Sequence, residues 1–174
     1  MSALLKNIKL LLLDVDGVLT DNQIYISSDE TELKSFCIDD GTGAAIARFA
    51  KLHLGLLSGR YSKCTDIWAN ELGITCCIQG VIDKKNKLLE ICESFNIELD
   101  EIAYVGDALI DIPVFEKVGV SIAVPNAHSL VKEKADIITD SHGGRGVLTE
   151  LVEKILIAQN RYEETLLKMK NEKF

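Results

Sequence analysis

The sequence predicts an α/β protein in which a doubly wound parallel sheet carries helices on both faces. The first observation is a series of short apolar runs that end at acids, glycines or prolines. The second is the alternation of these runs with segments whose apolar residues recur every three or four positions, as in amphipathic helices. The third is a length of 174 residues with 47% hydrophobic residues and only 2 prolines. A chain of this length buries about 70% of the surface of its unfolded form, so it can fold without a metal or a disulfide.

Five apolar runs are expected to be strands of this sheet. The first, Ile8–Val15, is largely apolar and ends in acid, as expected for a strand that is buried on both faces. The other four are residues 54–57, 76–78, 102–105 and 120–124. Segments with helical periodicity lie between the strands, at about 42–52, 62–72, 84–95, 110–117 and 127–133. Because strand and helix alternate, the strands are expected to run parallel.

Two segments depart from this alternation. Residues 23–38 contain two short β-like runs around a turn-prone sequence and predict a β-hairpin. Apolar residues three or four apart predict one long amphipathic helix from about 146 to 170, within a C-terminal segment of about 146–174. The glycine cluster Gly143–Gly146 before this helix is interpreted as a flexible loop. No linker or repeat interrupts the chain, so residues 1–174 are expected to form a single domain.

The charge of the chain limits its partners. A formal net charge of −8 argues against nucleic acid or a membrane surface as the main partner. A phosphorylated substrate is compatible with this charge if a cation or a few basic side chains gather locally. The five cysteines show no CxxC spacing and are interpreted as reduced thiols, which suits a cytoplasmic protein. The apolar run Leu10–Leu13 is too short for a signal peptide or a membrane span.

Carboxylates, a hydroxyl and a guanidinium follow the predicted strands directly. They are, in chain order, Asp14, Asp16, Ser58, Arg60, Asp107 and Asp111. Ligands of open parallel sheets bind beyond the carboxyl ends of the strands, so these groups are expected to converge at one edge. Four carboxylates repel one another unless a cation neutralises them, and an all-oxygen set of ligands suits Mg²⁺.

Such a set of groups is suited to phosphoryl transfer. A carboxylate beside Mg²⁺ can attack phosphorus and form an acyl phosphate, which divides one slow hydrolysis into two easier steps. A second carboxylate two residues on can protonate the leaving alcohol and then take a proton from the attacking water. A hydroxyl and a cationic side chain can hold the phosphoryl oxygens. Enzymes accelerate the hydrolysis of phosphate monoesters by up to ~10²¹-fold, and positioned charges are the means that this chain offers.

Four motifs occur along the chain in a fixed order. They are DVDGVLTD (Asp14–Asp21), LLSGR (Leu56–Arg60), Lys84 in VIDKK, and YVGDALID (Tyr104–Asp111). Together they resemble the motifs of the haloacid dehalogenase superfamily of aspartyl-phosphate phosphatases, which have a Rossmann-like fold. The resemblance implies that Asp14 is the nucleophile and Asp16 the general acid and base. It implies that Ser58 and Lys84 hold the phosphoryl group.

The same resemblance implies a metal site. Its Mg²⁺ ligands would be Asp14, Asp107 and the backbone carbonyl of Asp16. Asp111 would support this site from nearby, although a role as cap of the following helix is the alternative. Lys84 stands beside Lys85 and Lys87 on one helix start, so its selection rests on the resemblance.

The spacing of the motifs leaves no room for a separate cap domain. The 44 residues from Asp14 to Ser58 are used by the hairpin and one helix, and the 26 residues from Ser58 to Lys84 by a helix and a strand. A bare site would be open to water. A symmetric oligomer is therefore expected, in which the hairpin or the C-terminal segment of one subunit covers the cleft of its neighbour.

Further segments resemble one capless subgroup of the superfamily. The hairpin, the sequences IDDGTG and ELG, and the late GGRG are similar to the 3-deoxy-D-manno-octulosonate 8-phosphate phosphatases of lipopolysaccharide sugar synthesis. The similarity covers about residues 6–152 and implies a homotetramer, with the hairpins in a central barrel and the tail at an adjacent active site. The substrate-binding residues that it implies are Asp16, Asp39, Asp40, Gly41, Ser58, Gly59, Arg60 and Lys84.

Departures from the sequence pattern of this subgroup allow more than one sugar phosphate as the substrate. Trp68 and Thr149 stand where the subgroup often has arginines, and Ala108 replaces a usual acid. Arginine reads a sugar carboxylate through charge-assisted hydrogen bonds, and Arg145 could replace such contacts. A nine-carbon keto-sugar acid phosphate of the sialic acid type, or another sugar phosphate, is therefore an alternative.

Two non-hydrolytic functions are alternatives for a chain of this predicted fold. One is a non-catalytic partner domain of a cytidylyltransferase, which the four converging charges disfavour because they lower stability. The other is a phosphoacceptor receiver domain, in which the acidic pair precedes the acceptor by a whole βα unit, unlike Asp14 and Asp16 here.

Overall fold

A computed structural model describes residues 3–171 and contains a six-stranded parallel sheet with the order β5-β4-β1-β6-β7-β8. Its strands are β1 (Leu10–Leu13), β4 (His53–Leu57), β5 (Cys76–Ile78), β6 (Ile102–Gly106), β7 (Val120–Ala123) and β8 (Ile137–Ile138). The predicted doubly wound parallel sheet is confirmed. The edge strand β8 was not predicted, because two residues are too few to show a period.

The centre of the sheet determines where a ligand can bind. All four residues of β1 are completely buried, which explains the unbroken run of leucines. At its end, Leu13 pairs with Leu56 of β4 on one side and with Val105 of β6 on the other. The order of the strands therefore reverses at β1, and a crevice opens at the carboxyl ends of β1 and β6.

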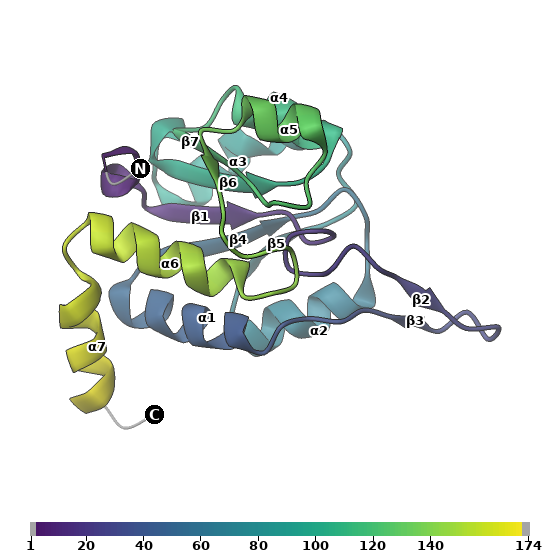
Figure 1. The fold of residues 1–174 in the computed structure, drawn as a ribbon, viewed down its shortest axis with the longest axis horizontal. Coiled ribbons are helices and arrows are strands. Elements are labelled where there is room, and N and C mark those ends of the chain that lie inside the picture. Colours follow the sequence, from purple (N-terminus) through teal and green to yellow (C-terminus); the bar gives the residue numbers. More distant parts are fainter. Residues whose placement is uncertain (1–2, 172–174) are drawn as a thin grey trace.

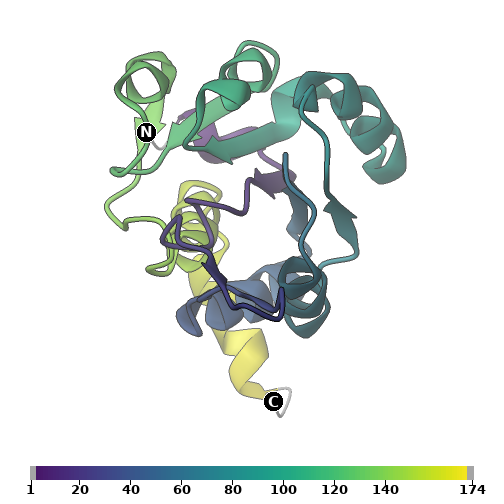
Figure 2. The same ribbon diagram turned by 90° about the vertical axis from the view of Figure 1, so that its right-hand side faces the viewer.

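Helices cover both faces of the sheet, as Figures 1 and 2 show. One layer contains α1 (Asp39–Ala50), α2 (Lys63–Leu72) and α6 (Val147–Ala158), and the other α3 (Leu88–Phe95), α4 (Ile112–Phe115) and α5 (Ser129–Lys134). Short 3-10 turns occupy Leu4–Asn7, Lys84–Lys87, Leu99–Glu101 and Leu109–Asp111. Between residues 3 and 171, none of the helices has the length and apolar character that crossing a bilayer requires.

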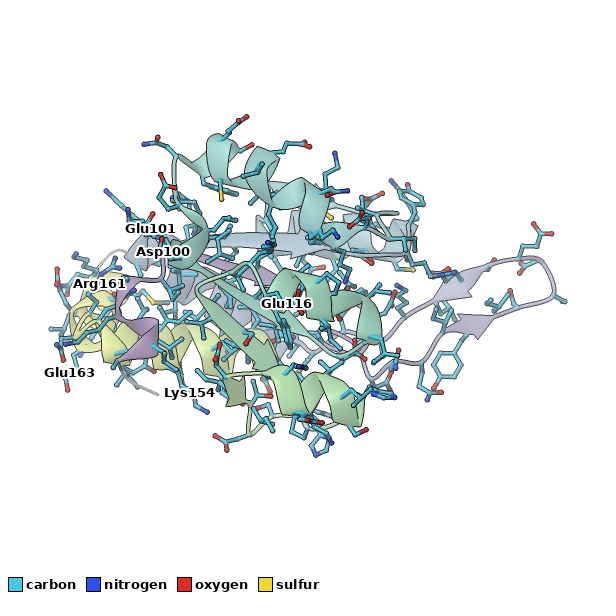
Figure 3. The ribbon with its side chains drawn as sticks, turned by 90° about the horizontal axis from the view of Figure 1, so that it is seen from above. Asp100, Glu101, Glu116, Lys154, Arg161 and Glu163 are labelled. Carbon is cyan, nitrogen blue, oxygen red and sulfur yellow. The ribbon has the colours of Figure 1, made fainter. Side chains whose placement is uncertain are left out.

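The C-terminal segment consists of two helices, so the prediction of one long helix from about 146 to 170 is wrong. After α6 the chain turns at Asn160, which has a φ of 55°, and α7 (Tyr162–Asn171) follows. Arg161 in this turn donates a hydrogen bond to the carbonyl of Ala50 at the end of α1. Figure 3 shows Arg161 at the end of the molecule opposite the hairpin. The apolar period continues through the turn and conceals it, and residues 172–174 of the tail lie outside the described residues.

The predicted hairpin is confirmed within residues 23–38, which are called the flap below. Its strands β2 (Tyr25–Ile26) and β3 (Glu32–Leu33) pair antiparallel and project beyond the carboxyl ends of the sheet strands (Figure 1). Tyr25, Ile26 and Leu33 are 58%, 70% and 60% exposed. Among the described residues no folded unit besides the flap is inserted between the motifs, which confirms the prediction of a protein without a cap domain.

Candidate active site

Two carboxylates meet across the crevice between β1 and β6. Asp14 follows β1, Asp107 follows β6, and one oxygen of each lies within 4.8 Å of the other and of an oxygen of Asp111. The chain after Asp14 passes through Gly17, which has a φ of 87°. A Cβ atom at Gly17 would overlap the carboxylate of Asp107, so only glycine allows this approach.

Lys84 brings a positive charge to these carboxylates. Its side chain is completely buried, and its Nζ lies 2.8 Å from Asp14 Oδ2 and 2.7 Å from Asp111 Oδ1. Burial acts to lower the pKa of Lys84, but the two carboxylates outweigh it and raise this pKa. Lys84 is therefore an ammonium in the folded protein. Of the three neighbouring lysines, the structure places Lys84 in the crevice. Lys85 is exposed, and Lys87 pairs with Glu90 of α3.

The remaining negative charge favours a bound cation. Burial raises the pKa of Asp14 to about 6, and Lys84 offsets only part of this effect. Burial and the neighbouring carboxylates raise the pKa of Asp107 to about 7. Among the described residues, the buried Oδ1 of Asp107 has no hydrogen-bond partner. Anionic oxygens that one ammonium does not neutralise, with one oxygen unpaired, fit a divalent cation.

Asp111 organises the crevice from one side. Its Oδ1 accepts hydrogen bonds from Lys84 at 2.7 Å and from the Tyr104 hydroxyl at 2.6 Å. Its Oδ2 accepts from the backbone N–H groups of Asp107 and Ala108, both at 3.0 Å. Asp111 thus fixes both Lys84 and the loop of Asp107. Tyr104 was not singled out from the sequence, although it is a lone aromatic hydroxyl in a completely buried strand.

The second motif lies at the end of β4, beside β1. The Ser58 hydroxyl is buried and donates to the carbonyl of Arg60 at 2.9 Å. A Cβ atom on Gly59 would lie 2.9 Å from the Ile110 side chain, so the turn is tight. The Arg60 side chain extends to the flap, where its guanidinium lies 2.5 Å from Glu32 Oε2. Hydrogen bonds from Arg60 and Ser62 lower the pKa of Glu32 to about 2, so Glu32 is a carboxylate.

A flap residue also reaches Asp16. The Nζ of Lys34 lies 2.5 Å from Asp16 Oδ1, and the Lys34 side chain is completely buried although the flap itself is exposed. Neither Lys34 nor Glu32 was predicted as part of the site. They are 18 and 28 residues from Asp16 and Arg60 respectively, and no local pattern indicates such distant contacts.

The predicted substrate segment Asp39–Gly41 begins α1. The carbonyl of Asp39 accepts a hydrogen bond from the Thr149 hydroxyl at 2.6 Å, so Thr149 joins α6 to α1. Gly41 faces open space. Asp40 is completely buried, and its Oδ1 accepts from the backbone N–H of Leu148 in the first turn of α6 at 3.0 Å. The structure uses Asp40 to cap α6, and contact of this segment with substrate stays a prediction.

The Asp40→Asn substitution is expected to remove one source of pH dependence. Burial raises the pKa of Asp40 from 3.8 to about 6, so between these values only the folded chain binds this proton. The resulting stability is present below the lower value and is lost as the pH rises through the higher one, with a size of about 2–3 kcal/mol. Asparagine stays neutral and keeps the acceptor for Leu148. In urea unfolding, the free energy of unfolding of the variant relative to that of the wild type should rise by about 2 kcal/mol between pH 4.5 and pH 7.5. A pH-independent difference would contradict this role.

The glycine loop is held against the first motif, so the prediction of a flexible loop is wrong. The N–H of Gly143 donates to Asn126 Oδ1 at 2.7 Å, and the N–H of Gly144 donates to the Val18 carbonyl at 2.9 Å. A Cβ atom on Gly143 would overlap the carbonyl of Gly17, to which Asn126 also donates. The loop therefore supports the turn that carries Asp14 and Asp16.

Trp68, which stands where the subgroup often has an arginine, contacts the flap. Its ring stacks on Phe36, with centroids 5.3 Å apart and an angle of 17° between the planes. This contact joins α2 to the end of the flap. Arg145 is exposed beside the glycine loop.

The strand order and the aspartates at the crevice define a class of hydrolase. Residues 50–151 match the family model of haloacid dehalogenase-like hydrolases, and the chain belongs to this family. It is a phosphoric monoester hydrolase, as the sequence predicted.

Within this family, the chain is similar to particular phosphatases. The chain is 42% identical over 159 residues to 3-deoxy-D-manno-octulosonate 8-phosphate phosphatase KdsC of Escherichia coli K12, covering 91% of this chain and 85% of the relative. It is 38% identical to the phosphatase of that name from Moraxella catarrhalis, solved with magnesium, phosphate and KDO, with a TM-score of 0.91 and 97% of both chains covered. It is 32% identical to the cobalt-bound Haemophilus influenzae phosphatase, with a TM-score of 0.88 and 94% and 99% covered.

These similarities confirm the predicted superfamily and the resemblance to its capless subgroup. Both metals in the relatives are divalent, in agreement with the carboxylate set of Asp14 and Asp107.

Proposed function

We propose that the chain hydrolyses 3-deoxy-D-manno-octulosonate 8-phosphate with Mg²⁺, through an aspartyl phosphate on Asp14. The observation that carries this proposal is the position of Asp14 at the crevice, between the Lys84 ammonium and the unpaired oxygen of Asp107. A phosphoryl group beside Asp14 would meet one positive side chain and one cation site. The similarity to the Escherichia coli enzyme over 91% of the chain supports the substrate.

The first half of the reaction transfers the phosphoryl group to the protein. A carboxylate oxygen of Asp14 attacks phosphorus, a new O–P bond forms and the bond to the sugar oxygen breaks. Asp16 gives its proton to that oxygen, so the sugar leaves as an alcohol. Lys84 holds Asp14 in place and, with Ser58, binds the phosphoryl oxygens. Asp14, Asp107 and the backbone carbonyl of Asp16 would hold Mg²⁺, which would supply positive charge that offsets the anionic ester.

The second half restores the protein. Asp16, now a carboxylate, takes a proton from a water molecule that attacks the aspartyl phosphate. Inorganic phosphate leaves with the new oxygen, and Asp14 is again a carboxylate. Asp111 contributes by holding Lys84 and the loop of Asp107, which keeps the cation ligands and the ammonium at fixed separation.

Substrate specificity is tested by a phosphate-release screen. The panel contains eight- and nine-carbon keto-sugar acid phosphates and simple sugar phosphates, each with Mg²⁺, with Co²⁺ and with a chelator. The highest kcat/KM is expected for the eight-carbon acid with Mg²⁺. Preference for the nine-carbon acid would assign the alternative substrate. Absence of release from every ester would favour the non-catalytic partner function.

We also propose that the chain is a cytoplasmic homotetramer in which flaps of neighbouring subunits cover the clefts. The exposed Tyr25, Ile26 and Leu33 form an apolar patch that favours association, and the five cysteines are free thiols, which suits a reducing compartment. Contact of the tail with a neighbouring cleft, and the assignment of residues 1–174 to one domain, stay predictions.

The Ile26→Asp substitution is expected to dissociate this assembly. Ile26 is 70% exposed in the single chain, so the charge does not disturb the core but opposes burial between subunits. Light scattering should give the mass of four chains for the wild type and a smaller mass, with lower activity, for the variant. Leu89→Asp, at a 67% exposed position on α3, is the matched control and should stay tetrameric. A wild-type monomer with full activity would contradict the shared clefts.

A further inference from the structure

The flap presents two opposite charges to the crevice. Glu32 lies in β3, and Lys34 follows directly after the end of this strand. Glu32 pairs with Arg60 after β4, and Lys34 pairs with Asp16 after β1. A row of alternating charges thus runs from Arg60 through the flap to Asp16, and it ties the flap to two motifs of the active site.

The burial of Lys34 distinguishes it from an ordinary surface lysine. Its side chain is completely buried, whereas its neighbour Leu33, the last residue of β3, is 60% exposed. Removing an ammonium from water is unfavourable unless a partner of opposite charge compensates. Among residues 3–171 the hydrogen-bond partner of Lys34 is Asp16, which itself retains 21% of its side-chain exposure. The geometry therefore directs this buried charge to one carboxylate.

The contact leaves half of the Asp16 carboxylate available. Lys34 holds Oδ1, and within the described part of the chain Oδ2 has no side-chain or backbone donor. Asp16 stands on the turn after β1, so without an anchor its side chain can rotate among several rotamers. Fixing one oxygen restricts the other to a narrow range of positions in the crevice.

We propose that Lys34 is a positioning residue that orients Asp16 toward the leaving oxygen of the substrate. Proton transfer then depends on the flap being in the position that pairs Lys34 with Asp16. This inference rests on the proposed function, in which Asp16 moves the proton. Lys34 does not bond to the reacting atoms. It acts through Asp16, so its loss slows the step that needs a proton and spares the attack by Asp14.

Two esters separate these steps. A sugar alkoxide is a poor leaving group and needs the proton from Asp16 as its bond to phosphorus breaks. A p-nitrophenolate leaves without a proton. In single-turnover experiments with saturating enzyme, Lys34→Met should slow release of the sugar alcohol by roughly 10²-fold, which is the usual contribution of a positioned general acid. Release of p-nitrophenol should slow by less than about 5-fold. In separate steady-state experiments, KM for both esters should be unchanged.

Four further variants sharpen the test. Lys34→Arg keeps a cation on the flap and should recover much of the lost rate. The double variant Lys34→Met with Asp16→Asn should be no slower than Asp16→Asn alone, because both changes remove the same proton transfer. Lys85→Met removes an exposed lysine near the site and should behave as the wild type.

Several outcomes would overturn the inference. Equal slowing of both esters with a lower Tm would make Lys34 a structural residue of the flap. A raised KM with unchanged kcat would make it a substrate-binding residue. If the rate losses of the two single variants add in the double variant, Lys34 does not act through Asp16. If the wild type hydrolyses neither ester, the proposed function itself fails and this inference falls with it, so the two failures are distinguishable.

Discussion

Asp14→Asn is expected to lower phosphate release by roughly 10⁴-fold or more, the loss typical of removing a nucleophile. The carboxamide cannot form the acyl phosphate. Asp111, the other carboxylate in contact with Lys84, is completely buried, and both its oxygens already accept hydrogen bonds, so it is not expected to replace Asp14. Steady-state phosphate release with Mg²⁺ measures the effect. The fold should persist, because Lys84 keeps its contact with Asp111 at 2.7 Å and the substitution removes one of the crowded charges.

The control for this variant is a matched change at the other end of the molecule. Asp100 is exposed and lies opposite the flap in Figure 3, so Asp100→Asn should keep wild-type turnover. Circular dichroism should show all three proteins folded. Turnover of Asp14→Asn within tenfold of the wild type would remove Asp14 from the nucleophilic role.

Lys84→Met is expected to affect both stability and activity. The variant leaves Asp14, Asp107 and Asp111 buried without a compensating ammonium, and breaking a buried ion pair in this way costs about 3–5 kcal/mol. Activity should fall by roughly 10³-fold, because Asp14 loses its partner and the phosphoryl group loses a cationic donor. Urea unfolding in the presence of a chelator and steady-state phosphate release measure the two effects. Lys85→Met, one position on and exposed, is the control for both.

The pH dependence of this loss tests its electrostatic origin. The pKa of Asp14 is raised to about 6 and that of Asp107 to about 7, and both rise further without Lys84. At pH 5 these carboxyls are neutral and the missing ammonium matters little. The stability deficit should therefore be small at pH 5 and should grow as the pH rises through 6 and 7. A deficit that is constant from pH 5 to 8 would assign the effect to packing instead.

The parts of the fold that followed from the sequence are those with a local signal. The leucines of β1 and the acids that follow them in the sequence predicted a buried strand with a site at its end. The structure confirms the strand. The turn at Asn160 was missed because apolar residues keep their helical spacing on both sides of it. The two-residue strand β8 is defined by its pairing with β7, which no local pattern shows.

The site residues also fall into those that local motifs predicted and those that only distant contacts define. Asp14, Asp107 and Lys84 were found through motifs that stand at the ends of elements, and the structure brings them together. Lys34 was not predicted because it is a single charged residue in a polar hairpin, and its burial accompanies a contact with Asp16, which lies 18 residues away in the sequence. Asp40 also caps α6, and this contact spans 108 residues of sequence, so no local pattern predicts it. Its contact with substrate stays a prediction.

Trapping the covalent intermediate tests the proposed chemistry most directly. The enzyme is mixed with substrate and Mg²⁺, quenched in acid within one turnover and reduced with borohydride, which converts an aspartyl phosphate to homoserine. Mass spectrometry of the peptide that contains Asp14, Asp16 and Gly17 then locates the change. Homoserine at position 14, absent without substrate, is the expected result. Homoserine at another aspartate, or none during active turnover, would show that phosphorus is not attacked by Asp14.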